Sequence, residues 1–283
     1  MKIAIIAPGA MGARVAARLA ANGVQVLTSL AGRSASSRAR AEAAEMRDVP
    51  DHALTEAALI LSIVPPGDAL ALARRLAPAL AAAREKPAYV DCNAVSPQTV
   101  GRISAVIAEA GAPFVDAAII GGPPQPGKSG PVFYLSGKEA ARAAVLGAHG
   151  IVVKQLDGPV GAASGLKMSY AGITKGFTAL GAAMMLAASR FGADAALHAE
   201  LAESQPQLLA QLTRSVPGMF PKAYRWVAEM EEIAGFAAAD PAAAAIYQGI
   251  ARLYERLAAD QAGEKREIGA LAAFVGKPAA SDH

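Results

Sequence analysis

Residues 2–19 carry the sequence Lys2-Ile-Ala-Ile-Ile-Ala-Pro-Gly-Ala-Met-Gly-Ala-Arg-Val-Ala-Ala-Arg-Leu19, which predicts a strand, a tight turn and a helix in immediate succession. The β-branched run from Ile3 to Ile6 is typical of a buried strand, and a helical pattern starts directly after Gly9. Backbone N–H groups at the start of such a helix can hold a pyrophosphate. The stretch therefore indicates a dinucleotide-binding unit.

The turn matches only part of the glycine fingerprint of such units. Gly9 and Gly12 hold its second and third glycine positions, where the backbone approaches a phosphate and the helix packs against the strand. Ala7 stands at the first position, so an ordinary strand–helix turn stays open on this motif alone. The residues expected to contact the cofactor here are Pro8, Gly9, Ala10, Met11 and Gly12.

Composition argues against several other classes of protein. Hydrophobic residues make up 53% of the chain, but its longest uncharged apolar stretch, Gly176–Ser189, is too short to cross a bilayer and predicts a buried helix. The net charge is only +3 and no basic cluster is interleaved with aromatic residues, so we expect neither a membrane nor a nucleic-acid partner. The single cysteine, Cys92, excludes an internal disulfide and suits the cytoplasm, and the four histidines show no metal-ligand spacing.

Short apolar runs alternate with helical patterns as far as residue 157. The expected strands are Lys2–Ala7, Val24–Ser29, Leu59–Val64, Ala88–Cys92, Phe114–Ile120, Val132–Leu135 and Ile151–Leu156. Helical patterns such as Gly67–Ala83 and Pro97–Ala110 lie between most of them. This alternation predicts a doubly wound, mostly parallel α/β sheet, and the Gly/Pro-rich stretch Gly121–Pro131 leaves room for antiparallel pairing of the later strands.

Strand signals stop after residue 160. The expected helices are Ala162–Phe191, Ala193–Thr213, Lys222–Phe236, Pro241–Ala259 and Gly263–Phe274, punctuated at Gly192, Pro217, Gly218 and Gly235. We therefore expect a nucleotide-binding domain over residues 1–160 and an all-helical domain over residues 161–283, joined by a connecting helix over residues 161–191.

The segment after the second strand indicates the cofactor. Units that bind NAD usually carry an acidic residue there for the ribose 2′-hydroxyl, and this chain has none from Asn22 to Ala41. Hydroxyl groups and a guanidinium suit a 2′-phosphate instead. We therefore expect NADP(H), bound in part by Thr28, Ser29, Arg33 and Ser34.

Four further segments occur in an order that resembles the β-hydroxyacid dehydrogenase and 6-phosphogluconate dehydrogenase-like superfamily. They are Leu61-Ser-Ile-Val-Pro-Pro66, Asp91-Cys-Asn-Ala-Val-Ser-Pro97, Asp116-Ala-Ala-Ile-Ile-Gly-Gly122 and Gly161-Ala-Ala-Ser-Gly-Leu-Lys-Met-Ser-Tyr-Ala171. The resemblance covers nearly the whole chain and implies a Rossmann domain, a long interdomain helix and a helical C-terminal domain. Residues 222–234 are similar to a subgroup known only as a domain of unknown function attached to this fold.

The resemblance implies contacts for each segment. It assigns the cofactor to Ile63, Val64, Pro65, Pro66, Asn93 and Ala94, and the substrate to Asn93, Ile120, Gly121, Gly122 and Lys167. Tyr170 and Trp226 are further side chains expected to line the substrate site. Ile120 replaces the usual serine, and Tyr170 and Ala171 replace two asparagines, so the substrate pocket departs from the family pattern.

Lys167 takes the position of the family's catalytic lysine. Its ammonium could protonate a carbonyl oxygen while a nicotinamide supplies hydride, and partial burial would lower its pKa for the reverse reaction. We expect a dehydrogenase or reductase of 3-hydroxyacids or related carbonyl compounds that forms a homodimer through its helical domain. An imine reductase on the same fold and a non-catalytic NADP(H)-binding regulator remain alternatives.

Overall fold

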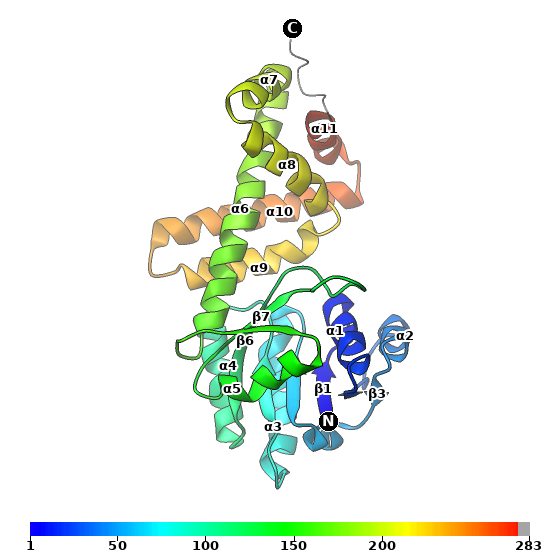
Figure 1. Cartoon of the computed structure of the whole chain (residues 1–283). Helices are drawn as coiled ribbons and strands as arrows, with labels where there is room; N and C mark the ends of the chain where they lie inside the picture. Colours follow the sequence, from blue (N-terminus) through cyan, green and yellow to red (C-terminus); the bar gives the residue numbers. More distant parts are fainter. Residues whose placement is uncertain (277–283) are drawn as a thin grey trace. The chain divides into compact units, whose positions relative to one another are not determined.

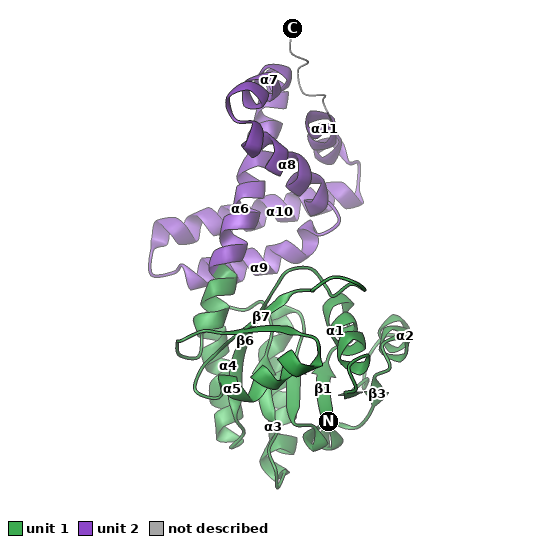
Figure 2. Ribbon diagram, viewed as in Figure 1, with its two compact units in different colours: residues 1–168 green, residues 169–283 purple. Residues whose placement is uncertain are grey.

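The computed structural model describes residues 1–276 and divides the chain into two compact units, Met1–Met168 and Ser169–His283 (Figure 2). The first unit contains a single sheet of eight strands in the order β3-β2-β1-β4-β5-β6-β7-β8. The strands are β1 (Lys2–Ile6), β2 (Gln25–Thr28), β3 (Arg47–Asp48), β4 (Leu59–Ser62), β5 (Ala88–Asp91), β6 (Phe114–Ile120), β7 (Val132–Ser136) and β8 (Val152–Gln155). All neighbouring pairs are parallel except β6 and β7, which are antiparallel.

Helices cover both faces of this sheet (Figure 1). One face packs against α1 (Ala10–Ala20), α2 (Ala35–Ala43), α5 (Ala140–Ala143) and η3 (Ala144–His149), and the other against η1 (Asp51–Glu56), α3 (Ala69–Ala82) and α4 (Pro97–Glu109). Strand side chains alternate between the two cores, as Ile3 and Ile5 face the first and Ala4 and Ile6 the second. The doubly wound fold class predicted from the sequence is therefore confirmed.

The seven predicted strands all form, and the antiparallel pairing expected among the later strands occurs between β6 and β7. The sequence missed β3, because two residues, Arg47 and Asp48, are too short to show a strand period. A turn of 3-10 helix, η2 (Pro66–Asp68), leads into α3.

The second unit is helical. Its elements are the greater part of α6 (Ala162–Arg190), then α7 (Asp194–Ser204), α8 (Pro206–Met219), α9 (Ala223–Phe236), α10 (Pro241–Ala262) and α11 (Arg266–Val275). The single helix expected over Ala193–Thr213 is wrong, because Pro206 starts a new helix after Gln205. Pro217 and Gly218 do not end α8, and Gly235 lies inside α9, because tertiary packing overrides their weak helical propensity.

Helix α6 has 29 residues and is the one described helix that is long and apolar enough to cross a membrane, with 44% of its apolar window buried. It is longer than the uncharged stretch Gly176–Ser189 because it continues through Lys175. Within the second unit it packs closely on its neighbours: a Cβ at Gly172 would lie 2.8 Å from the Tyr247 hydroxyl of α10. Such close packing is typical of the core helix of a bundle.

Candidate functional site

The turn between β1 and α1 leaves backbone donors free at a helix start. The first helical hydrogen bond runs from the Ala13 N–H to the Gly9 carbonyl at 2.9 Å, so the N–H groups of Ala10, Met11 and Gly12 have no acceptor within the helix. No side chain caps α1, and its first turn carries no acidic residue. A Cβ at Gly12 would overlap the Ala7 carbonyl oxygen, whereas Gly9 borders open space. The turn fits a pyrophosphate group.

Positive charge reaches this turn from α2. Arg40 donates from Nε to the Pro8 carbonyl at 2.8 Å and from Nη2 to the Ser37 hydroxyl at 3.0 Å. Beside it lies a cavity of about 700 Å³, lined by α1, α2 and the loop between β6 and β7. Ala10 is the predicted cofactor residue among those that line it. No sequence motif points to the contribution of Arg40, because the contact joins residues that are 32 positions apart.

The loop after β2 separates the four residues predicted to hold a 2′-phosphate. Thr28 and Ser29 are buried, and the Thr28 hydroxyl donates to the Ile5 carbonyl at 2.8 Å. Ser34 is exposed as the N-cap of α2, and Arg33 is half-buried in the turn before it. Arg33 and Ser34 are therefore the members of this set whose polar groups lie toward the surface.

The ends of β4 and β5 bring two predicted segments together, since the two strands are neighbours. The side-chain amide of Asn93 donates to Ser62 Oγ at 2.8 Å and to Asp91 Oδ2 at 3.0 Å, and its oxygen accepts from the Val64 N–H at 2.7 Å. Both functions of this amide are thus engaged within the protein. Among the other predicted residues here Val64 is buried, Ile63, Pro66 and Ala94 are half-buried, and Pro65 is exposed.

The side chains of Asp91 and Cys92 are buried at this edge of the sheet. Burial raises the pKa of Asp91 to about 7, against the opposing effect of hydrogen bonds from Asn93. Burial also raises the pKa of the neighbouring Cys92 thiol well above its ordinary value. Cys92 is therefore a structural thiol, not a nucleophile.

Asp116 on β6 holds the start of α6. Its carboxylate accepts from the backbone N–H groups of Gly161, Ala163 and Ser164 at 2.9, 3.0 and 3.2 Å, and from the hydroxyls of Ser136 and Ser164 at 2.8 and 2.6 Å. A carboxylate at a helix N-terminus satisfies free donors and complements the helix dipole. The first turn of α6 is therefore fixed to the sheet.

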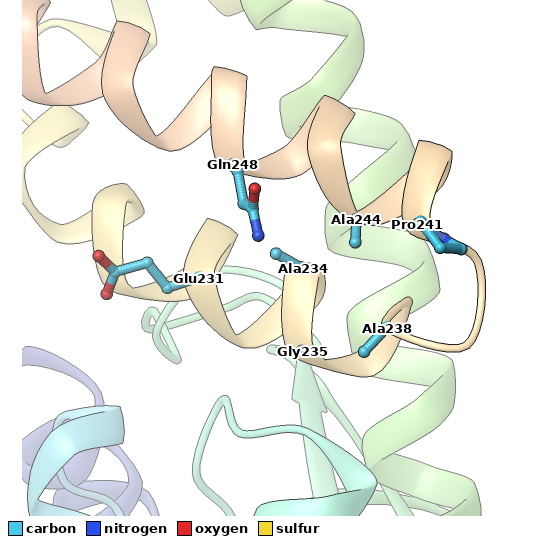
Figure 3. Close-up of a pocket in the computed structure, with 7 residues that line it drawn as sticks. All are labelled: Glu231, Ala234, Gly235, Ala238, Pro241, Ala244 and Gln248. Carbon is cyan, nitrogen blue, oxygen red and sulfur yellow. The ribbon is translucent and has the colours of Figure 1, made fainter.

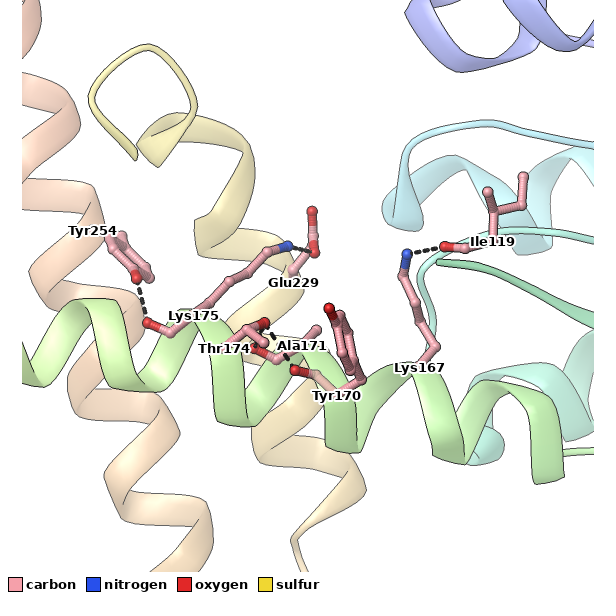
Figure 4. A network of polar contacts seen from close by, with 8 residues as sticks. All are labelled: Ile119, Lys167, Tyr170, Ala171, Thr174, Lys175, Glu229 and Tyr254. Carbon is pink, nitrogen blue, oxygen red and sulfur yellow. Dashed lines mark hydrogen bonds and ion pairs between the residues drawn. The ribbon is translucent and has the colours of Figure 1, made fainter. Parts of the chain in front are cut away.

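Lys167 follows one turn later and donates from Nζ to the Ile119 carbonyl (Figure 4). Ile119 directly precedes the predicted substrate turn, in which Ile120 is half-buried and Gly121 and Gly122 are exposed. Gly121 has a φ of +121°, a conformation that a side chain disfavours. Lys167 and this turn are therefore neighbours within the first unit.

Tyr170 and Trp226, the other two predicted substrate residues, belong to the second unit. Tyr170 is 52% exposed. Trp226 packs edge-on against Tyr254, with ring centroids 5.2 Å apart, and the Lys175 ammonium lies 5.0 Å from its ring centre. Lys175 forms an ion pair with Glu229, while burial lowers the pKa of Lys175 (Figure 4).

A second cavity, of about 510 Å³, lies between α9 and α10 (Figure 3). Its lining is mostly small, with three alanines, Gly235 and Pro241, and Glu231 and Gln248 are the longer polar side chains. None of the predicted site residues lines it. Within residues 1–276, no three His, Cys, Asp or Glu side chains lie close enough to hold a metal ion.

Residues 2–148 match the family model for the NAD binding domain of 6-phosphogluconate dehydrogenase. The chain belongs to this family. Residues 188–257 match a domain of unknown function, DUF1932, which confirms the resemblance noted for residues 222–234. An uncharacterized 28.5 kDa protein of Methanothermus fervidus is 30% identical over 216 residues, or 75% of this chain and 82% of that protein.

Solved structures share the whole architecture of this 6-phosphogluconate dehydrogenase-like protein. A conserved protein of unknown function, described as similar to 3-hydroxyacid dehydrogenases, has 28% identity and a TM-score of 0.71 over 96% of this chain and 99% of its own. The 3-hydroxyisobutyrate dehydrogenase of Mycobacterium tuberculosis has 19% identity and a TM-score of 0.70 over 92% and 94%. An imine reductase of Streptomyces aurantiacus has 18% identity and a TM-score of 0.55 over 98% and 100%. The protein is a nicotinamide-dependent oxidoreductase of this fold.

Two further residues of this 6-phosphogluconate dehydrogenase-like protein stand out that sequence reasoning assigned no role. Asp116 belongs to one of the four motifs but was expected to make no contact of its own, yet its carboxylate holds the start of α6. Asp48, at the end of the unpredicted strand β3, accepts from the Leu30 N–H at 2.8 Å and so lies beside the loop after β2. The only possible signal for Asp116 was an acidic residue within an apolar run, whereas Asp48, between Arg47 and Val49, had none.

Proposed function

We propose that this protein is an NADP(H)-dependent dehydrogenase or reductase of small or medium 3-hydroxyacids, or of related carbonyl compounds, with Lys167 as general acid and base. The observation that carries this proposal is the hydrogen bond from the Lys167 ammonium to the Ile119 carbonyl, directly before the turn Ile120-Gly121-Gly122. A lysine beside two glycines combines a proton donor with backbone that a substrate carboxylate can approach closely.

The bound nicotinamide supplies or accepts the hydride. In the reductive direction the carbonyl carbon receives the hydride and the carbonyl oxygen takes a proton from Lys167 Nζ. The ammonium also stabilises the negative charge that develops on this oxygen before proton transfer is complete. In the oxidative direction the neutral amine removes the hydroxyl proton as hydride leaves the carbon.

Residues 1–160 would bind the dinucleotide, and residues 161–283 would complete the substrate site after the connecting helix 161–191. Support for the pyrophosphate contact comes from the uncapped start of α1. Support for NADP(H) comes from Arg33 and Ser34 in the loop after β2. The remaining assignments, including the roles of Asn93, Tyr170 and Trp226, rest on the family resemblance.

A homodimer formed through the helical unit is part of the proposal. Ile173, Leu180 and Met184 recur on α6 at intervals of seven and four residues, so they follow one side of the helix, and Phe191 comes directly after its end. They are 71%, 59%, 60% and 90% exposed. An apolar stripe of this kind suits burial against a second copy. The single buried Cys92 is in keeping with a cytoplasmic protein.

Titration with NADPH and NADH, followed by nicotinamide fluorescence, tests the cofactor. Turnover of 3-hydroxyacids with NADP+, lost in Lys167→Met while NADPH still binds, would support the proposed reaction. Binding of neither nucleotide would contradict it.

An imine reductase is the second candidate, favoured by the exposed Tyr170, which could donate a proton in place of a carboxylic acid. Reduction of a cyclic imine with no activity on any hydroxyacid would establish this alternative. Biological function retained by Lys167→Ala without turnover would favour a regulator.

A further inference from the structure

The fold places an acidic residue, Asp48, beside the end of β2, although Asp48 is distant from β2 in the sequence. Asp48 on β3 is the register partner of Thr28, the last residue of β2. Its Oδ1 accepts from the Leu30 N–H at 2.8 Å. The position next to the end of β2, which the sequence leaves without an acid from Asn22 to Ala41, is therefore acidic in the folded protein.

Arg38 on α2 lies against this carboxylate. Its Nη1 is 3.8 Å from Asp48 Oδ2, and its Nη2 donates to the Leu30 carbonyl at 2.8 Å. Asp48 and Arg38 thus hold the two polar groups of the Leu30 backbone between them. Their side chains are 48% and 51% exposed, so a ligand can reach both.

The charge beside the end of β2 decides which dinucleotide binds well. A carboxylate there accepts a hydrogen bond from the 2′-hydroxyl of NAD(H) and repels the 2′-phosphate of NADP(H). Asp48 alone would therefore favour NAD(H), against the expectation from Arg33 and Ser34. Arg38 balances this charge, because a guanidinium near a carboxylate offsets its field at short range.

We propose that Arg38 sets the cofactor preference of this protein by neutralising Asp48, so that removing the guanidinium turns an NADP(H) site toward NAD(H). The inference rests on the proposed function in that it takes nicotinamide dinucleotides as the ligands of the loop after β2. It adds a specificity role for two residues that lie outside the set predicted from the sequence.

Arg33 and Arg38 differ in the result expected on substitution. Arg33→Ala removes a phosphate contact and should weaken NADPH binding while leaving NADH binding unchanged. Arg38→Ala should weaken NADPH binding and also strengthen NADH binding, because it frees the Asp48 carboxylate. The ratio of the two dissociation constants should shift toward NADH by about tenfold or more, as expected for an energy near 1.4 kcal/mol.

The experiment measures dissociation constants for NADPH, NADH and 2′,5′-ADP at one ionic strength. The variants are Arg38→Ala, Asp48→Asn, their combination, and Arg38→Lys. Arg47→Ala is the matched control, since it removes an equal charge from the neighbouring residue of β3. Thermal unfolding of each variant without nucleotide detects any general loss of folding.

Recovery of the NADPH preference in the double variant, and its retention in Arg38→Lys, would support the proposal. An equal shift in Arg47→Ala, or an unchanged ratio in a folded Arg38→Ala that still binds NADPH, would overturn the role of Arg38 and leave the proposed function standing. A wild-type protein that binds none of the nucleotides would overturn both this inference and the proposed function.

Discussion

Asp91 on β5 and Asp116 on β6 are direct partners in the parallel register of the sheet, and both side chains are fully buried. Asp116 accepts five hydrogen bonds from backbone N–H groups and hydroxyls. Asp91 receives hydrogen bonds only from Asn93 among those resolved here, and the charge of Asp116 opposes its ionisation. The two neighbouring carboxyl groups therefore differ in the number of donors that face them.

Asp91 should make folding stability depend on pH. Burial raises its pKa from 3.8 to about 7, so the folded protein binds more protons than the unfolded chain between these values. The contribution of Asp91 to stability is complete below pH 4 and is lost as the pH rises through 7. In chemical denaturation, the stability difference between wild type and Asp91→Ala should shrink by about 1–3 kcal/mol from pH 5 to pH 8. A difference that stays constant over this range would contradict the assignment.

Asp116 should be among the most sensitive positions in the first unit. Asp116→Ala leaves two buried backbone N–H groups and two hydroxyls without their acceptor, while the Ala163 N–H keeps its bond to Ser136 Oγ. The free energy of unfolding should therefore fall by about 3 kcal/mol or more. Ser136→Ala, which removes one of the five donors, should cost about 1 kcal/mol. Similar losses in the two variants would show that Asp116 does not carry the start of α6.

Lys167→Met should lower kcat by about 10²–10⁴-fold if the lysine transfers the proton in the reaction. The dissociation constant for NADPH should stay within about twofold of wild type, because Lys167 is expected to act in proton transfer and not in cofactor binding. Lys167→Arg should also be slow, because a guanidinium does not give up its proton at neutral pH. Near wild-type kcat in Lys167→Met would remove this residue from the mechanism.

Removing one partner of the ion pair between Lys175 and Glu229 should destabilise the protein more than replacing both partners with apolar side chains. Glu229→Gln leaves the largely buried Lys175 ammonium without its partner, and the free energy of unfolding should fall by about 2 kcal/mol. The double variant Lys175→Met/Glu229→Leu should lie closer to wild type, because apolar side chains of similar size need no partner. The hydrogen bond from Tyr254 to the Lys175 carbonyl is kept in both. A double variant less stable than Glu229→Gln would contradict this account.

Arg18 should hold the loop between β6 and β7 in place. Its guanidinium donates to the carbonyls of Gln125 and Lys128, both at 2.9 Å, and to that of Gly150 at 3.4 Å. In Arg18→Met, trypsin should cleave after Lys128 several times faster than in wild type, since local opening governs such cleavage. Arg14→Met on the same helix is the control and should be cleaved at the wild-type rate.

The periodicity of the sequence was sufficient for the order of the strands in the first unit, apart from the two-residue β3. Strands such as Leu59–Ser62 and Ala88–Asp91 are fully buried, and their continuous apolar runs can be recognised from the local sequence alone. The break at Gln205 and the continuation of α8 through Pro217 were missed, because packing decides between helix ends of similar local propensity. Gly12 and Lys167 were predicted as site residues because each belongs to a short motif.

Local patterns thus established the alternating elements and the glycine turn, and they predicted the candidate lysine and the turn Ile120-Gly121-Gly122, since each depends on residues close in the chain. The approach of Asp48 to Leu30, of Arg40 to Pro8 and of Asp116 to Ser164 emerged only from the folded chain. These contacts join residues 18, 32 and 48 positions apart, and strand register and helix packing create them. The charge around the expected cofactor therefore depends on the pairing of the strands. The two-residue strand β3 places the Asp48 carboxylate beside the end of β2, and the segment after β2 has no acidic residue of its own.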